Sequence, residues 1–201
     1  MTKLEIAQKV LISTGGIAKT ADFIAAGLAK YDVCNLNHDG HLERIHHGYY
    51  KLANNYDITE EQILEALLPE GIVCVESALF YYGYSDFTPR LWTLAVPRTI
   101  SRAKIKIDDV PIKVYYIPNQ YYELGKISAD FDGTTLSIYD RERTICDCFK
   151  YRTRLDNELF NKAIHTYVAD EQKSLCNLSK YAREMGLFKR VHELMEVLLN
   201  G

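Results

Sequence analysis

The first 53 residues consist of short helical patterns separated by glycines, and this spacing constrains the fold more than any other feature. Apolar residues recur at helical spacing from Lys3 to Ser13, and Thr14-Gly15-Gly16 ends that pattern. A second helix is predicted from an N-cap at Thr20 to Ala26, and a third at about 29–37. Gly27 supplies the tight turn between these two helices.

Two short strand patterns follow the three helices. Leu42, Arg44 and Ile45 belong to the first, Tyr49 to Leu52 form the second, and His46-His47-Gly48 lie between them. Three short helices followed by a hairpin is the element order of a winged helix-turn-helix. The sequence therefore predicts such a domain at residues 1–53.

The rest of the chain predicts a mixed α/β domain at residues 59–201. Polar residues 54–57 read as a linker, and Thr59 with Gln62 resembles a capping box. Helices are expected from 59 to 68 and from 74 to 82, and later at 141–151, 157–168, 174–184 and 188–199. Strands are expected between them, at 91–96, 105–107, 112–117, 124–128 and 134–138. A small central sheet with C-terminal helices indicates the α+β class.

Composition is that of a soluble protein: 47% of the residues are hydrophobic and 25% are charged, with a net charge of −3. The five cysteines are scattered and follow no secretory leader, which favours reduced thiols in a cytoplasmic protein. The longest apolar stretch is too short to span a bilayer, so no membrane partner is expected.

The third predicted helix would carry the residues that read DNA. Its outward side chains at Lys30, Tyr31, Asn35 and Asn37 are candidates, since asparagine can pair with adenine and lysine with guanine or phosphate. Lys19 and Thr20 begin the preceding helix, where free N–H groups favour a phosphate oxygen. The hairpin would add three more candidates, which are Arg44, His46 and His47.

Charge gives this hypothesis modest support. Before Ala53 the chain has six Lys and Arg residues against five Asp and Glu residues, a net of +1 that leaves −4 for the rest. A secondary basic run could extend a DNA footprint or meet an acidic partner, and consists of Arg98, Arg102, Lys104 and Lys106. The alternative for the same pattern is a module that binds proteins and no DNA.

The candidate metal and catalytic motifs of the sequence have simpler explanations. His38, His41, His46 and His47 cluster in the sequence, but their spacing matches no closed zinc site. Cys146 and Cys148 are two apart on a predicted helix, so one is expected in the core and the other partly exposed. Asp130 and Asp132 loosely resemble the metal-binding pair of nucleotidyltransferases, but a hairpin turn explains Asp132-Gly133. We expect no enzyme, metal or cofactor.

Several longer motifs occur in a defined order. The hairpin segment reads Gly40-His41-Leu42-Glu43-Arg44-Ile45-His46-His47-Gly48-Tyr49-Tyr50-Lys51-Leu52, after Gly15-Gly16 and Gly27-Leu28. Downstream come Glu76-Ser77-Ala78-Leu79, then Ala95 to Arg98, and then a D-x-ERT-x-x-D segment at 140–147. In these motifs the chain resembles the AbiEi antitoxins of abortive-infection, type IV toxin–antitoxin systems.

This resemblance implies a transcriptional regulator that represses its own operon by binding inverted repeats in double-stranded DNA. It also implies that the protein counters a nucleotidyltransferase-type toxin, which it need not contact directly. Two alternatives stay open beside it. One is an interaction module that captures a protein through the C-terminal helices, and the other is a nucleotidyltransferase-like enzyme using Asp130 and Asp132.

Overall fold

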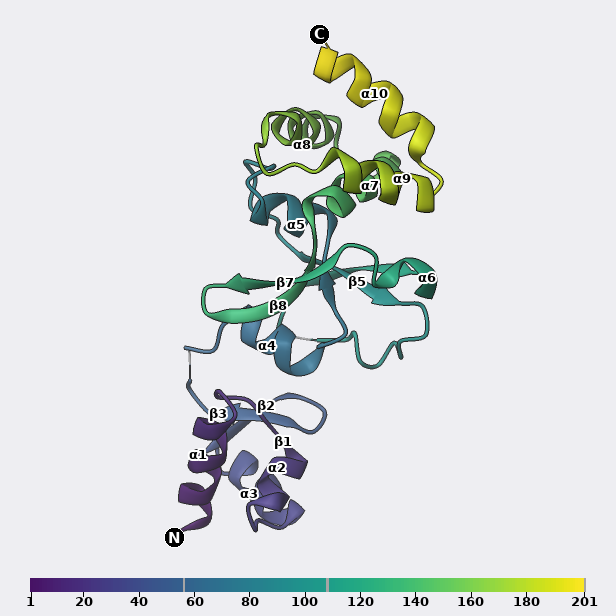
Figure 1. Cartoon of the computed structure of the whole chain (residues 1–201). Coiled ribbons are helices and arrows are strands. Elements are labelled where there is room, and N and C mark those ends of the chain that lie inside the picture. Colours follow the sequence, from purple (N-terminus) through teal and green to yellow (C-terminus); the bar gives the residue numbers. More distant parts are fainter. Residues whose placement is uncertain (56, 108, 201) are drawn as a thin grey trace. The chain divides into compact units, whose positions relative to one another are not determined.

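The computed structural model describes residues 1–55, 57–107 and 109–200, which form two compact units (Figure 1). The first unit contains residues 1–69 and 101–111, and the second contains 70–100 with the chain from 112 onward. Helices and two separate sheets occur together, so the fold is of the α+β class. None of the described helices has the length and apolar composition that crossing a membrane would require.

The first unit begins with three helices and a small antiparallel sheet whose strand order is β1-β3-β2. Its elements are α1 (Lys3–Ser13), β1 (Ala18–Lys19), α2 (Thr20–Ala25), α3 (Lys30–His38), β2 (Leu42–His46), β3 (Tyr49–Leu52) and α4 (Glu60–Leu67). One apolar cluster joins α1, α2, α3 and the hairpin, with Phe23 packed edge-on against Tyr50. The helices and hairpin expected from the sequence are confirmed, and so is the Thr59–Gln62 capping box of α4.

The predicted N-cap of α2 was wrong by one residue. Lys19 occupies the cap position and Thr20 is the first helical residue. The Thr20 hydroxyl does not cap the helix because it donates to the carbonyl of Gly48, 3.3 Å away, and the Thr20 N–H donates to the same oxygen at 2.8 Å. Thr20 therefore fastens the start of α2 to the turn of the hairpin.

The second unit is built on a five-stranded mixed sheet of order β6-β5-β4-β8-β7. The strands are β4 (Ile72–Val73), β5 (Trp92–Pro97), β6 (Ile112–Ile117), β7 (Lys126–Phe131) and β8 (Thr134–Tyr139). β5 runs parallel to β6, and β4 runs parallel to β8, whereas β4–β5 and β7–β8 are antiparallel. The predicted Asp132-Gly133 turn is confirmed, with φ values of 50° and 91° that suit a tight hairpin.

Helices cover this sheet. They are α5 (Val75–Tyr81), α6 (Asn119–Tyr122), α7 (Arg141–Lys150), α8 (Asn157–Ala169), α9 (Leu175–Glu184) and α10 (Phe188–Asn200), with a 3-10 turn at Arg152–Arg154. Figure 1 shows α5, α7, α8 and α9 on one side of the sheet. Because α7 contacts α5, α8, α9 and α10, every residue from Glu142 to Phe149 is buried.

Two expectations for the predicted domain at residues 59–201 were wrong. Residues 105–107 form no strand, because this stretch lies in the connection from β5 to β6 and pairs with no strand of the described chain. Cys146 and Cys148 are both fully buried, whereas one was expected to be partly exposed. The expectation assumed a helix with one solvent face, but α7 is packed on all sides.

Candidate nucleic-acid interface

The outer face of α3 is an exposed helical surface of the first unit and bears predicted site residues. Leu28, Val33 and Leu36 point inward and are 3%, 0% and 8% exposed. Gly27, at φ 98°, makes the turn that brings Leu28 under the helix, since an L side chain rarely adopts this conformation. The helical period then leaves Lys30, Tyr31 and His38 on the outside, with Tyr31 at 73% exposure.

Asn35 and Asn37 lie at the sides of this exposed face. Both side chains are partly buried, unlike those of Lys30 and Tyr31. Cys34 is exposed on the outer face of α3, three residues after Tyr31 and four before His38. The sequence-based candidates omitted Cys34, although helical spacing from Tyr31 places it in the middle of the same row.

Carboxylates already occupy the beginnings of α2 and α3. Asp22 accepts from the backbone N–H of Lys19 at 2.7 Å, and Asp32 accepts from that of Ala29 at 2.9 Å. Lys3 donates to Asp32 at 2.7 Å, and this contact, with the Ala29 bond, lowers the pKa of the Asp32 carboxyl. A phosphate near either helix start would meet this negative charge, so its binding would depend on side chains such as Lys19 and Lys30.

One face of the small sheet gathers further candidate residues. Lys19 pairs with Tyr49 across β1 and β3, and His46 pairs with Tyr49 from β2. The Lys19 ammonium lies 5.6 Å from the Tyr49 ring centre, and the His46 and Tyr49 rings are 6.2 Å apart. The structure therefore brings Lys19 and His46 together around Tyr49, a residue that was not among the candidates.

The hairpin itself is irregular between Arg44 and His46, where the register shifts by one residue. Arg44 is exposed, and its Nε donates to the carbonyl of His46 at 3.3 Å. His47 is exposed in the turn. A bulge of this kind redirects a side chain, and here it leaves the Arg44 guanidinium on the surface while Ile45 is buried.

The secondary basic run is not carried by one element. Arg98 follows β5 in the second unit, where its N–H donates to the carbonyl of Ile117. Arg102, Lys104 and Lys106 lie in the 101–111 connection, which belongs to the first unit. All four side chains are exposed.

The residues considered for metal binding or catalysis do not converge. Among the described residues, no group of three or more His, Cys, Asp and Glu side chains could hold a metal ion. Asp130 accepts a hydrogen bond from the backbone N–H of Gly133 at 3.2 Å, so it supports the hairpin turn that contains Asp132.

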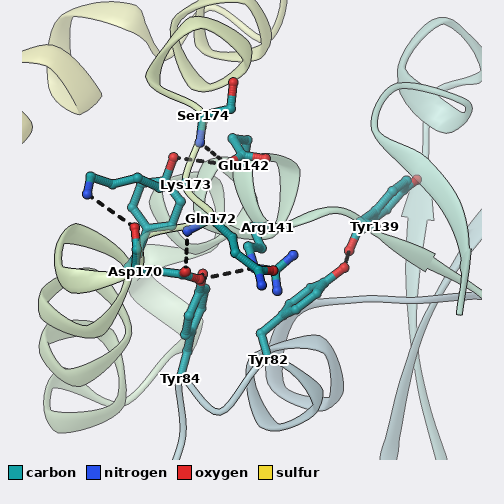
Figure 2. A network of polar contacts seen from close by, with 10 residues as sticks. Tyr82, Tyr84, Tyr139, Arg141, Glu142, Asp170, Gln172, Lys173 and Ser174 are labelled. Carbon is teal, nitrogen blue, oxygen red and sulfur yellow. Dashed lines mark hydrogen bonds and ion pairs between the residues drawn. The ribbon is translucent and has the colours of Figure 1, made fainter. Parts of the chain in front are cut away.

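The D-x-ERT-x-x-D segment forms a polar network inside the second unit (Figure 2). Glu142 accepts from the Tyr167 hydroxyl at 3.2 Å and from the Ser174 N–H at 2.7 Å. The Arg141 Nε donates to Asp170 at 3.0 Å, and Tyr84 also donates to that carboxylate. These contacts tie the first turn of α7 to the connection between α8 and α9.

The same helix contains a buried ion pair between Arg143 and Asp147. The Nε of Arg143 lies 3.2 Å from Oδ2 of Asp147, and both side chains are at most 1% exposed. Arg143 also donates to the carbonyls of Tyr121 and Leu124 at 2.6 and 2.8 Å. Burial raises the pKa of Asp147, and the Arg143 charge opposes that shift. These residues stabilise the second unit and are not available to a ligand.

Comparison with solved structures finds the same fold elsewhere. The chain is similar to the crystal structure of the RV2827C protein from Mycobacterium tuberculosis, with a TM-score of 0.62 and 13% sequence identity. The match covers 88% of this chain and 70% of that one. No family model matches the chain, and no curated protein does. At this identity the likeness concerns the fold alone.

Proposed function

We propose that the protein is a DNA-binding transcriptional regulator whose residues 1–53 form a winged helix-turn-helix, with α3 as the helix that enters the major groove. One observation supports this most directly. The α2–Gly27–α3 turn buries Leu28, Val33 and Leu36 and leaves Lys30, Tyr31 and Cys34 on an exposed face. The β2–β3 hairpin follows as the wing, with Arg44 of β2 exposed on it.

The motif resemblance extends this proposal to a biological role. The protein would act in the cytoplasm as the antitoxin of a type IV toxin–antitoxin system and repress its own operon through inverted repeats. It would counter a nucleotidyltransferase-type toxin without having to bind it. A direct test is binding to its own upstream DNA over a series of salt concentrations. A specific complex that weakens as salt rises is expected, since phosphate contacts release counterions; absence of any such complex would contradict the proposal.

Two single substitutions should separate base reading from phosphate binding. Asn35→Ala is expected to relax sequence preference by about 1–3 kcal/mol, if Asn35 pairs with a base edge. Arg44→Ala is expected to weaken binding to specific and random duplexes alike and to lower the salt slope by about 1. Titrations of both variants against operator and scrambled DNA would show this. If Asn35→Ala kept the full preference, α3 would not read bases through that residue.

The reactivity of the cysteines towards a thiol reagent can show where DNA binds, and it provides an internal control. Cys34 on α3 and Cys176 on α9 are exposed, whereas Cys74, Cys146 and Cys148 are buried. Burial raises the pKa of all three buried thiols, which keeps them protonated and unreactive. A thiol reagent should therefore label two cysteines in the folded protein.

Upstream DNA should slow labelling of Cys34 and leave Cys176 unaffected. The variants Cys34→Ser and Cys176→Ser assign each labelling phase. Equal labelling of Cys34 with and without bound DNA would place the duplex elsewhere on the protein.

A further inference from the structure

Strand β7 is an open edge of the five-stranded sheet. It is the last strand in the order β6-β5-β4-β8-β7 and pairs only with β8 among the described strands. Lys126, Ile127, Ser128 and Asp130 are exposed, and Ile127 has 43% of its surface in solvent. An exposed edge with a large apolar side chain is a template for another strand.

The hairpin register shows which backbone groups of β7 are free to pair. The two-residue turn makes Phe131 and Thr134 a hydrogen-bonded pair, and the alternation then assigns Ala129 and Ile127 to bonds with β8. The N–H and C=O groups of Lys126, Ser128 and Asp130 therefore point away from β8. The Lys126 N–H donates to the carbonyl of Glu123 at 3.3 Å. The edge open to a partner therefore consists of the Lys126 C=O and of the N–H and C=O groups of Ser128 and Asp130.

The charges on this edge are complementary to those of β7 from a second copy of the chain that runs in the opposite direction. Lys126 and Asp130 are four residues apart and share one face of β7. In an antiparallel pair centred on Ser128, Lys126 of each copy lies opposite Asp130 of the other. The same register pairs Ser128 with Ser128 of the other copy and brings the Lys126 C=O to the N–H of Asp130, because residues that face the partner are then opposite one another.

The contacts that these side chains make within their own chain lie at the surface. Lys126 is 3.2 Å from Glu123, whose side chain is 68% exposed, and it lies 5.5 Å from the centre of the Tyr122 ring. Asp130 accepts from the Gly133 N–H and remains exposed. Exposed ion pairs contribute little to stability. Lys126 can therefore exchange Glu123 for the Asp130 carboxylate of a second copy at a small cost in free energy.

We propose that β7 pairs with β7 of a second copy of this chain, antiparallel and centred on Ser128, and so joins the two sheets into one. In this register the charges of Lys126 and Asp130 are complementary to those of the second copy. The opposite edge strand, β6, lacks such a pattern, since its charged residue Lys113 is held by Glu76 at 2.6 Å. This inference does not depend on DNA binding.

Charge-reversal variants test the register. Lys126→Asp and Asp130→Lys each replace both ion pairs with like charges, so each should self-associate about tenfold more weakly than the native chain. An equimolar mixture of the two variants should associate again, because the two kinds of chain are complementary. Sedimentation equilibrium over a concentration series measures this. Lys180→Asp, on the exposed face of α9, is the matched control and should behave like the native protein.

A backbone variant tests the strand pairing itself. Ser128→Pro removes an outward N–H that β8 does not use, which an edge strand tolerates. It should abolish association while circular dichroism and thermal unfolding stay close to native. A chain that remains monomeric at all concentrations would overturn the proposal. Undiminished association of Ser128→Pro, or no recovery on mixing the charge variants, would also overturn it.

Discussion

Replacing Arg143 by leucine is expected to lower the free energy of unfolding by about 3–5 kcal/mol, because Asp147 would be left as an unpaired buried charge. Both side chains are at most 1% exposed, and the Arg143 guanidinium also satisfies the carbonyls of Tyr121 and Leu124. No water can replace these bonds without opening the packing around α7. Denaturant unfolding followed by circular dichroism would measure the loss.

Arg141→Leu is the matched control for this prediction. Arg141 lies on the same helix and also pairs with an aspartate, but its side chain is 30% exposed. A partly solvated pair of this kind is worth about 1 kcal/mol or less. The double variant Arg143→Leu/Asp147→Leu should recover part of the stability, since it removes both buried charges. If Arg141→Leu and Arg143→Leu lowered the free energy of unfolding equally, burial of the Arg143–Asp147 pair would not explain the loss.

Much of the architecture could be predicted from local patterns. Helical periodicity located α1, α3 and the C-terminal helices to within a residue or two, and β6 was predicted at its observed bounds. The two-residue strands β1 and β4 were missed because no alternation can be recognised over two residues. Residues 105–107 alternate as a strand does but pair with no strand of the described residues, and pairing is a property of the whole fold.

The candidate site was predictable to the extent that it depends on helical spacing. That spacing indicated that Lys30 and Tyr31 would lie outside, and the structure places them there. The contact of Thr20 with Gly48, and the grouping of Lys19 and His46 around Tyr49, depend on how β1 joins the hairpin. No local pattern contains that information.

Two of the motifs that carry the resemblance, Glu76–Leu79 and 140–147, make hydrogen bonds within the second unit. Glu142 is bonded to Tyr167 and Ser174, and Ser77 exchanges hydrogen bonds with Thr93. These partners lie between 16 and 32 residues away along the chain. Polar residues in a buried helix must be satisfied in this way, so these motifs specify the fold of the second unit. The exposed face of α3 is where DNA specificity would reside.

Reversing two charges should have the largest effect on DNA binding. The variant Lys30→Glu/Arg44→Glu is expected to bind upstream DNA about 100-fold more weakly, since it removes two phosphate contacts and adds repulsion. The slope of affinity against salt should fall by about 2. Loss of folding is not expected to explain this result, because both side chains are exposed and an acidic side chain favours the helix at Lys30, the first residue of α3.

The matched control is Lys180→Glu/Lys189→Glu, which changes the net charge by the same amount on exposed positions of α9 and α10. If DNA binding depended only on the electrostatic field of the whole protein, both double variants would lose similar affinity for DNA. A local interface predicts that the control retains nearly all of its affinity, because Lys180 and Lys189 belong to neither α3 nor the hairpin. Fluorescence anisotropy with the same labelled duplex decides between these outcomes. Equal losses of affinity would mean that α3 and the hairpin do not form the DNA-binding surface.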